Sequence, residues 1–366
     1  MLFALQSSSS RIFYMPDSVH KGNETFVVPI FSVRKSLFIC LFCVQREEID
    51  MAYVLLIIGF ILLIKGADYF VDGSSGLAKI FKVPAVIIGL TIVSMGTSAP
   101  EAAVSITSGL VGKNALAISN IVGSNIFNLL IVIGVCAVID KVEADKDIRK
   151  RDLPYNVILC ALLLVMIAFD GILGTVDAII LLVLFVGYIL WLVRDALKNR
   201  TQENDDAKKM PLWLCLICIV GGLAAIVFGG DMVVKNATKI ATSLGMSENL
   251  VGLTIVAVGT SLPELVTSIV ASRKGENEIA LGNAVGSCIF NILFILGMSG
   301  ALSPIVLQQN LGEHIVDLAV LIAVTLLFTV LCLIKKEVNR KAGFLCILLY
   351  IIYLAYIIAR NYGVFA

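Results

Sequence analysis

Charged residues are scarce in this chain of 366 residues. They make up 15% of the sequence, whereas soluble domains carry about 25%. Apolar residues account for 59%, and the mean hydropathy is +0.98. This composition excludes one or two ordinary soluble domains and favours an integral membrane protein. The net charge of +1 offers no basic surface for nucleic acid, so no nucleic-acid partner is expected.

Groups typical of enzymes and of zinc centres are also rare. The two histidines, His20 and His314, are far apart in the sequence. Two CxxC pairs, Cys40–Cys43 and Cys215–Cys218, lack the further ligands that would complete a zinc site, and a buried cysteine in an apolar run usually acts as a small hydrophobe. Neither a nucleophile–base pair nor a phosphate-binding loop is evident. We therefore expect neither an enzyme nor a resident cofactor.

Apolar segments long enough to cross a bilayer recur ten times after residue 51. A spanning helix needs about 20 apolar residues. The expected spans lie near 52–80, 83–112, 115–139, 153–169, 172–193, 212–243, 247–272, 278–303, 315–334 and 342–359. The expected fold is thus an all-α polytopic membrane protein with ten transmembrane helices.

Basic residues concentrate in alternate connections between these spans. If the first span starts outside, the inside connections hold 18 Lys and Arg and the outside connections with the C-terminus hold four. The positive-inside rule then places both termini outside the cell membrane and the 194–211 connection in the cytoplasm.

Residues 1–50 do not fit this pattern, because they are polar and irregular. Their one apolar run, Leu37–Val44, is too short to span a membrane, and no small-residue cleavage site follows it. We expect Met51 to be the biological start and 1–50 to be a non-native or disordered extension. The alternative is a genuine extension with little order.

An internal repeat runs through the rest of the chain. Gly89–Glu101 and Gly252–Glu264 are identical at ten of 13 positions, and Ile118–Asn128 and Leu281–Asn291 at seven of 11, both at an offset of 163 residues. The sequence therefore predicts two copies of one unit, 51–194 and 212–366, joined by a linker at 195–211. Five spans per copy make the second copy enter the membrane from the opposite side, and such inverted repeats hold transport sites at their interface.

Each copy carries the motif GTSxPE in the middle of an apolar span. Pro100 and Pro263 interrupt the helix, because neither has an N–H to donate to the carbonyl group four residues earlier, at Gly96 and Gly259. The two glycines weaken the helix further at these positions. Free carbonyls at membrane depth are tolerated where they line a cavity or meet a ligand. The motif therefore indicates a break that presents oxygen atoms to a bound ion.

Glu101 and Glu264 are the decisive residues of these motifs. A carboxylate at mid-membrane costs at least about 2.5–3.5 kcal/mol, so two of them require a cation or a proton. Hydroxyl and amide groups share helix faces with them or lie in the next span, namely Ser94, Thr97, Thr260, Ser124, Asn128, Ser287 and Asn291. A set of oxygen ligands without thiolate or imidazole suits Ca2+, Na+ or Mg2+.

Charge and coordination favour Ca2+ and Na+ among these ions. Mg2+ requires a tight octahedron and retains water, whereas Ca2+ accepts six to eight oxygens in flexible geometry. One Ca2+ or two Na+ would neutralise two carboxylates, and a third Na+ would leave the complex positive. The sequence thus predicts competition between the two ions, and hence electrogenic exchange.

The GTSAPE…GSNIFN and GTSLPE…GSCIFN pairs resemble the two alpha repeats of the sodium/calcium exchanger group in the calcium/cation antiporter superfamily. The resemblance covers about 51–360 and implies ten helices in two inverted sets of five, with external termini. It implies that Glu101 and Glu264 are the central Ca2+ and Na+ ligands. It also implies hydroxyl or carbonyl ligands at Thr97, Ser98, Thr260, Ser261, Ser124 and Ser287, and backbone carbonyl ligands at Ser94 and Ala257.

Two differences between this sequence and some members of the family indicate which type of exchanger it resembles. Some relatives have Asp at one of the positions that Asn128 and Asn291 occupy here, so this site has two carboxylates and K+ co-transport is not expected. The 194–211 connection is too short for a calcium-sensing regulatory domain. A small prokaryotic-type exchanger is the better match.

The function expected from the sequence is secondary antiport of Ca2+ against Na+ in the cell membrane, with the two ions and the bilayer as partners and no obligate protein partner. A Ca2+/H+ antiporter would use the same two glutamates, and a passive cation channel can also have inverted repeats. Ser98 and Ser261 have an ordinary alternative too, since hydroxyls in membrane helices often bond the carbonyl of the preceding turn.

Overall fold

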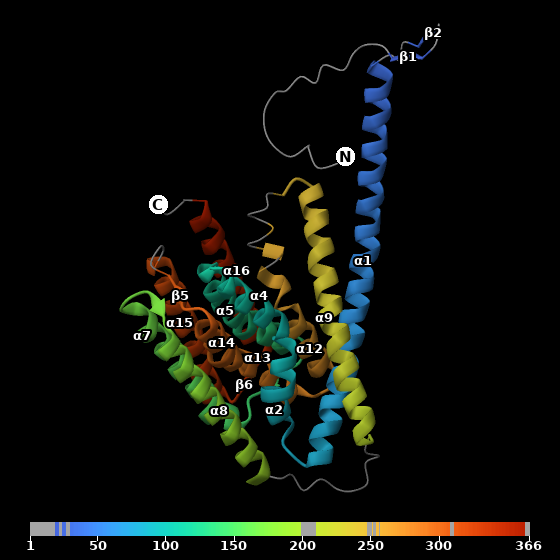
Figure 1. Ribbon diagram of the computed structural model, residues 1–366. Helices are drawn as coiled ribbons and strands as arrows, with labels where there is room; N and C mark the ends of the chain where they lie inside the picture. Colours follow the sequence, from blue (N-terminus) through green and yellow to red (C-terminus); the bar gives the residue numbers. More distant parts are fainter. Residues whose placement is uncertain are drawn as a thin grey trace. The chain divides into compact units, whose positions relative to one another are not determined.

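The computed structural model describes residues 19–21, 24–26, 30–198, 210–246, 251, 254–255, 257–307 and 311–362. Their side chains are described from residue 49 on, except at residues 114, 115, 257 and 361. The chain divides into two units, Met1–Met51 and Ala52–Ala366 (Figure 1).

The described residues of the first unit form strands and the start of a helix. The unit contains two short antiparallel strands, β1 (Val19–Lys21) and β2 (Glu24–Phe26). Helix α1 (Ile30–Phe81) begins at Ile30, so residues 30–50 are helical and not irregular. The apolar run near residue 40 has no proline or glycine between it and the predicted first span, so nothing in the sequence interrupts a helix there.

The second unit is a bundle of helices, several of which are broken into segments. In the first copy, the elements after α1 are α2 (Ala85–Ile88), η1 (Gly89–Val93), α3 (Ser94–Thr97), α4 (Ala99–Leu110), α5 (Asn114–Phe127), η2 (Asn128–Val132), α6 (Ile133–Ile139), β3 (Val142–Glu143), η3 (Ile148–Asp152), α7 (Leu153–Ala168), β4 (Ile172–Leu173) and α8 (Thr175–Lys198).

The second copy has a similar order of elements. They are α9 (Leu212–Ser243), α11 (Ala257–Gly259), α12 (Leu262–Arg273), α13 (Asn277–Phe290), η5 (Asn291–Leu296), α14 (Gly297–Leu302), β5 (Ile305–Val306), α15 (Leu311–Lys335), β6 (Glu337–Val338) and α16 (Arg340–Asn361). The η segments are π-helical turns. Gly112 and Gly275, 163 residues apart, adopt positive φ angles of 76° and 77° in the connections α4–α5 and α12–α13.

Eight helical segments among the described residues are long and apolar enough to cross a membrane, and a bent pair would make nine. The bent pair is Ala85–Thr97 with Ala99–Leu110, which meet at 50°. Of the ten expected spans, the one near 247–272 includes residues 247–250, 252–253 and 256, which lie outside the described part of the chain.

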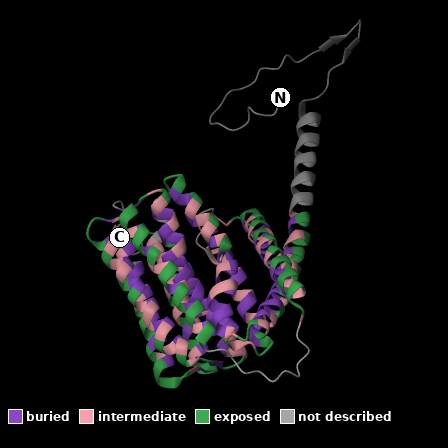
Figure 2. Ribbon diagram, turned by 60° about the horizontal axis from the view of Figure 1, so that its bottom comes forward, coloured by how far each residue is buried: buried purple, intermediate pink, exposed green. Residues whose placement is uncertain are grey.

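Burial separates central helices from peripheral ones. The most apolar stretch of Asn277–Leu302 is 94% buried, whereas those of Thr175–Lys198 and Leu212–Ser243 are 22% buried. The peripheral helices expose large apolar side chains, among them Val183, Leu190 and Val220. Figure 2 shows buried residues on the inner faces of the helices and exposed residues on their outer faces. An apolar exterior of this kind fits contact with lipid.

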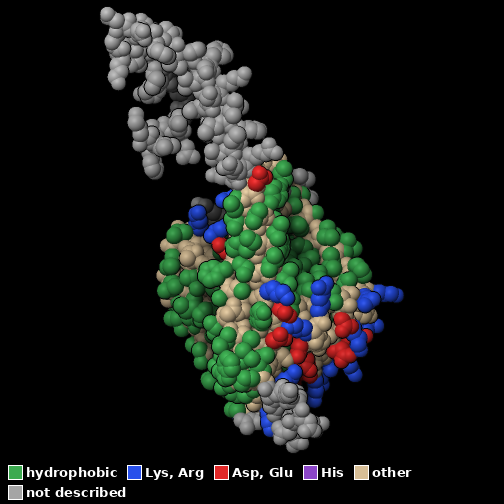
Figure 3. All heavy atoms as spheres, turned by 90° about the vertical axis from the view of Figure 1, so that its right-hand side faces the viewer, with side chains coloured by type: hydrophobic (Ala, Val, Ile, Leu, Met, Phe, Trp, Pro, Cys, Tyr) green, Lys and Arg blue, Asp and Glu red, His purple; other side chains and the backbone are tan. Residues whose placement is uncertain are grey.

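Charged side chains gather near one end of the face that Figure 3 shows, and apolar side chains cover much of the rest. Lys274, in the connection between α12 and α13, contacts Asp68 and Asp72 of α1 at 2.6 and 2.7 Å. These ion pairs join the two copies. Val111 occupies the position in the first copy that corresponds to Lys274, so no equivalent pair can form there.

The first helices of the two copies, α1 and α9, cross at glycines (Figure 1). A Cβ atom on Gly66 would lie 2.8 Å from the carbonyl oxygen of Gly222, and one on Gly222 would lie 2.7 Å from the carbonyl oxygen of Gly66. Gly59 and Gly229 approach each other in the same way, and each glycine of this pair lies 163 residues from a glycine of the first pair. Small residues let the two backbones touch, which is how membrane helices commonly associate.

Two short sheets also join one copy to the other. β3 pairs with β6 through Val142 and Val338, and β4 pairs with β5 through Ile172 and Val306, both antiparallel. Each of these sheets therefore contains one strand from the first copy and one from the second.

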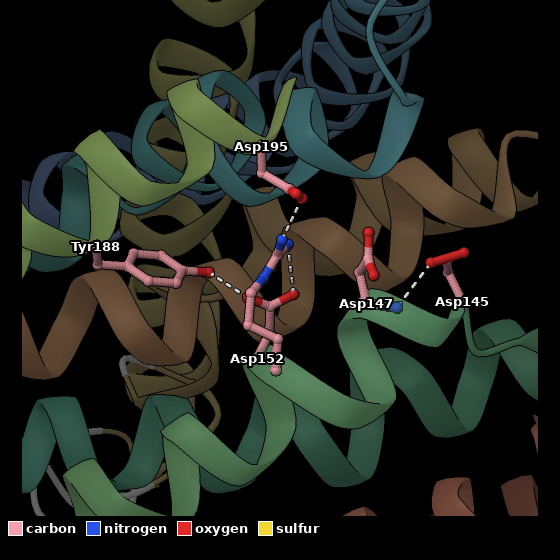
Figure 4. A network of polar contacts seen from close by, with 6 residues as sticks. Asp145, Asp147, Asp152, Tyr188 and Asp195 are labelled. Atoms are coloured by element: carbon pink, nitrogen blue, oxygen red, sulfur yellow. Dashed lines mark hydrogen bonds and ion pairs between the residues drawn. The ribbon is translucent and has the colours of Figure 1, made fainter. Parts of the chain in front are cut away.

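A buried charged cluster ties the start of α7 to α8 (Figure 4). Arg151 Nε and Nη2 contact the Asp152 carboxylate at 2.9 and 3.1 Å, and Arg151 Nη1 contacts Asp195. The Tyr188 hydroxyl donates to Asp152 at 3.0 Å, and Trp191 lies under the Arg151 guanidinium. Every charge in the cluster thus has a partner of opposite sign.

The second copy contains a related cluster at positions shifted by 165 residues. Asp317, the counterpart of Asp152, contacts Arg360 at 3.0 and 2.9 Å, and Arg360 occupies the position of Asp195. Tyr356 lies under the Arg360 guanidinium as Trp191 lies under Arg151. Each cluster thus joins two neighbouring helices within one copy, α7 to α8 and α15 to α16.

We expect Gly222→Ala to destabilise the protein by about 2 kcal/mol, because the added methyl group meets backbone atoms that cannot move aside. Gly221→Ala is the matched control. No described atom lies within 4 Å of a Cβ at Gly221, and alanine should favour the helix there. Thermal unfolding of the detergent-purified proteins measures the difference. A Gly222→Ala protein as stable as the control would contradict the close crossing of α1 and α9.

Candidate cation-binding site

The helix breaks predicted from GTSxPE lie at Ser98 and Ser261. Ser98 has φ −82° and ψ 9°, and Ser261 has φ −94° and ψ 7°, so both leave the helical conformation at the same motif position. Pro100 and Pro263 fall in the first turn of the next helix, where a missing N–H has no cost. The interruption therefore lies just before each proline and begins a new helix that carries the glutamate in its first turn.

The glycines of the motif serve close packing. A Cβ on Gly96 would lie 3.1 Å from Phe70 Cζ and from Leu223 Cδ1, and one on Gly259 would lie 2.3 Å from Val234 Cγ2. Their small size lets the broken helices approach α1 and α9.

The Glu101 side chain is fully buried at the start of α4. Its Oε1 accepts hydrogen bonds from Ser261 Oγ at 3.0 Å and from Ser124 Oγ at 3.3 Å, and these two hydroxyls are 2.8 Å apart. Ser261 belongs to the second copy. The carboxylate of the first GTSxPE motif is thus held by a hydroxyl of the second.

Glu264 has the reciprocal environment at the start of α12. Its Oε1 accepts from Ser98 Oγ at 2.7 Å, and Ser98 Oγ lies 3.0 Å from Ser287 Oγ. Ser98 belongs to the first copy, so each copy supplies the serine that holds the glutamate of the other.

The threonines of the motifs bond asparagines across the same interface. Thr97 Oγ1 donates to Asn283 Oδ1 at 3.0 Å, and Thr260 Oγ1 approaches Asn120 Oδ1 at 3.4 Å. Asn283 also donates to the Glu264 carbonyl at 3.3 Å and to Ser268 Oγ at 2.9 Å. Asn283 thereby fixes the backbone that carries Glu264.

Four buried oxygens in this region have no hydrogen-bond partner within the described part of the chain. They form two matched pairs, Oε2 of Glu101 and Glu264 and Oδ1 of Asn128 and Asn291. Both asparagines begin a π-helical turn, η2 and η5, a distortion often found at functional sites. Buried polar atoms without partners are costly unless an ion or water meets them. Carboxylate and carboxamide oxygens are hard ligands that suit Ca2+ or Na+.

The negative charges of the site have no basic partner within the described ranges of the chain. Among the ion pairs of the described residues, none involves Glu101 or Glu264. Hydroxyl groups stabilise one oxygen of each carboxylate but do not neutralise it. Two buried like charges therefore require a cation or a proton.

The backbone carbonyl groups of Ser94 and Ala257 were also expected to bind cations. The Ser94 carbonyl accepts the Ser98 N–H at 3.0 Å and lies 3.4 Å from Thr97 Oγ1, so it would have to share its lone pairs with an ion. Ala257 begins α11, and its side chain lies outside the described residues. Cation binding by these two carbonyls stays a prediction.

Asn125 was not among the site residues predicted from the sequence. Asn125 donates to the Cys288 carbonyl at 3.1 Å and accepts from Asn291 Nδ2 at 3.0 Å. The signal that could have identified it is the single difference between GSNIFN and GSCIFN, Asn125 in one motif and Cys288 in the other.

The family model described as sodium/calcium exchanger protein matches residues 51–194 and 214–359 of this chain. The chain belongs to the sodium/calcium exchanger family. The resemblance inferred from the GTSxPE and GSxIFN motifs is therefore confirmed, and this family member is a multi-pass membrane protein.

Individual relatives agree with this assignment. The inner membrane protein YrbG of Escherichia coli K12 is 35% identical over 320 residues, which cover 83% of this chain and 96% of that one. The sodium/calcium exchanger MaX1 of Methanosarcina acetivorans is 31% identical over 347 residues, 84% of this chain and 98% of its own length. So little of MaX1 lies beyond the match that it has no room for a separate regulatory domain.

A solved structure has the same fold. The sodium-calcium exchanger NCX_Mj, soaked with 2.5 mM Na+ and 0.1 mM Ca2+, aligns with a TM-score of 0.73 and 31% sequence identity. The alignment covers 83% of this chain and 98% of that structure.

The two asparagines that bond the motif threonines should differ in their contribution to stability. We expect Asn283→Ala to destabilise the purified protein by about 2–3 kcal/mol and Asn120→Ala by about 1 kcal/mol. Asn283 is fully buried with three partners, whereas Asn120 is half-buried and bonds Ser105 and, weakly, Thr260. Chemical or thermal unfolding in detergent measures both losses. Equal losses, or a larger loss for Asn120→Ala, would contradict this difference.

Proposed function

We propose that this family member is a secondary antiporter that exchanges Ca2+ for Na+ at a site between Glu101 and Glu264. The observation that carries the proposal is a set of four buried oxygens without a hydrogen-bond partner among the described residues. They are Oε2 of Glu101 and Glu264 and Oδ1 of Asn128 and Asn291. Hydroxyls of the opposite copy hold the other carboxylate oxygens. One side of each carboxylate is thus fixed by protein while the other is left for an ion.

The ligand chemistry supports Ca2+ and Na+ as substrates. Ca2+ takes six to eight oxygens at about 2.3–2.6 Å in flexible geometry. Two carboxylates, two amide oxygens and the hydroxyls of Ser98, Ser124, Ser261 and Ser287 could supply such a shell. The site charge of −2 is neutralised by one Ca2+ or by two Na+, and a third Na+ would make exchange electrogenic.

Reciprocal contacts support an inverted repeat with alternating access. The serine–glutamate bonds, the threonine–asparagine bonds and the glycine crossings all recur at an offset of 163 residues. We infer ten spans in two inverted sets of five, with both termini outside and the 194–211 connection in the cytoplasm. Two equivalent halves could exchange conformations and so expose the site to either side in turn.

Coupling to protons is the second candidate, because buried carboxylates without a basic partner can also be neutralised by protonation. Purified protein in vesicles loaded with Ca2+ distinguishes the candidates. We expect an inward Na+ gradient to release 45Ca2+ at constant pH and a pH gradient alone to have little effect. Release driven only by the pH gradient would favour Ca2+/H+ exchange, and release without any counter-ion would indicate a channel.

Removing either site charge should abolish exchange. We expect Glu101→Gln and Glu264→Gln each to lower the Na+-dependent 45Ca2+ flux by at least about 100-fold, or about 2.7 kcal/mol, because one carboxylate cannot balance a divalent ion. Glu143→Gln, on an exposed side chain of β3, is the control and should transport normally. Near-normal flux in either site variant, with protein recovered in the membrane, would refute the assignment.

A further inference from the structure

Two asparagines in the candidate site occupy equivalent positions but have unequal surroundings. Asn128 and Asn291 are 163 residues apart, and each begins a π-helical turn. Asn291 Nδ2 donates a hydrogen bond to Asn125 Oδ1 at 3.0 Å. Within the described residues, Asn128 Nδ2 has no such acceptor.

The difference comes from the position three residues before each asparagine. Asn125 occupies it in the first copy, and Cys288 in the second. Both residues are fully buried, and each reaches the backbone of the other: Asn125 Nδ2 donates to the Cys288 carbonyl at 3.1 Å, and Cys288 Sγ lies 3.7 Å from the Asn125 carbonyl. Cysteine has no amide oxygen, so Cys288 cannot accept a hydrogen bond from Asn128 Nδ2 as Asn125 Oδ1 accepts one from Asn291 Nδ2.

The Cys288 carbonyl determines the orientation of both amides in this chain of contacts. A carbonyl oxygen can only accept, so the group that Asn125 presents to it must be its NH2. The Asn125 Oδ1 is then the atom that faces Asn291, and Asn291 must present its own NH2 in return. The Oδ1 of Asn291 is then the atom for which the described residues provide no hydrogen-bond partner.

A cation can be bound by an amide oxygen but not by an amide NH2. An amide that is free to turn exposes either group, and holding the oxygen toward the ion therefore improves binding. Groups that orient metal ligands in this way typically change metal affinity by about 10- to 100-fold when they are removed.

We propose that Asn125 is a positioning residue that holds the Asn291 oxygen toward the bound cation. Asn128, the counterpart of Asn291, has no group among the described residues that fixes its amide in this way. The inference rests on the proposed function, since it takes Asn291 to be a ligand of Ca2+ and Na+. It makes the two halves of the site unequal, with one preset amide ligand and one adaptable one.

Asn125→Cys tests the proposal by giving the first copy the residue of the second. Equilibrium 45Ca2+ binding to detergent-purified protein is measured for this variant and for the unaltered chain, together with the Ca2+ concentration that half-saturates flux in vesicles. We expect the dissociation constant and the half-saturating concentration to rise about tenfold, with the maximal flux within about twofold.

A double-mutant cycle separates positioning from packing. In an Asn291→Ala background there is no amide to orient, so Asn125→Cys should cause no further loss of Ca2+ affinity. Ile126→Val, which removes a buried methylene from the same helix, controls for packing and should leave affinity unchanged. If Asn125→Cys protein is not recovered, Asn125→Leu, which has the same number of side-chain heavy atoms and the same branching but no hydrogen-bonding group, replaces it.

Each outcome has one meaning. Unchanged affinity in the Asn125 variant, or the same loss with Asn291→Ala present, would overturn the positioning role while leaving the proposed exchange intact. If the unaltered chain binds no Ca2+ and shows no Na+-dependent flux, the proposed function fails and this inference fails with it.

Discussion

The rest of this bundle depends on two buried carboxylates that have no basic partner in the part of the chain that the structure describes. Glu101 and Glu264 lie in the interior, and burying an uncompensated charge in a membrane protein is costly. The surrounding groups reduce this cost without removing it. Hydroxyls bond one oxygen of each carboxylate, and the first turn of a new helix places each glutamate where the helix dipole favours negative charge. The remaining stabilisation has to come from a cation or a proton, which makes the site dependent on its substrate.

Duplication makes the two halves complete each other's sites. Ser98 of the first copy holds Glu264 of the second, and Ser261 holds Glu101 in return. Neither copy could therefore form the site alone. The glycine crossings of α1 and α9 and the shared two-stranded sheets bring the copies close enough for these short side chains to meet. Where the two copies differ in sequence, as at Asn125 and Cys288, the two halves of the site have different hydrogen bonds.

Much of the architecture could be predicted from the sequence because its signals are strong and local. Long apolar runs gave the span of α9 to the residue, and the repeated GTSxPE motif gave the place of the helix breaks to within two residues. The N-terminal helix from Ile30 was not predicted, because the short apolar run near residue 40 was considered as a membrane span and as a signal-peptide core but not as part of a longer helix. The role of Asn125 could not be predicted either, since it depends on a backbone carbonyl of the other copy and on which end of a side-chain amide faces it.

The position of bound Ca2+ in a crystal, located by anomalous scattering, tests directly whether Glu101 and Glu264 bind one ion together. We predict a single strong peak between Glu101 and Glu264, with Oε2 of both glutamates and Oδ1 of Asn291 within about 2.3–2.6 Å of the ion. A crystal at saturating Ca2+ in which the ion lies elsewhere, or in which the two carboxylates bind no ion, would contradict it.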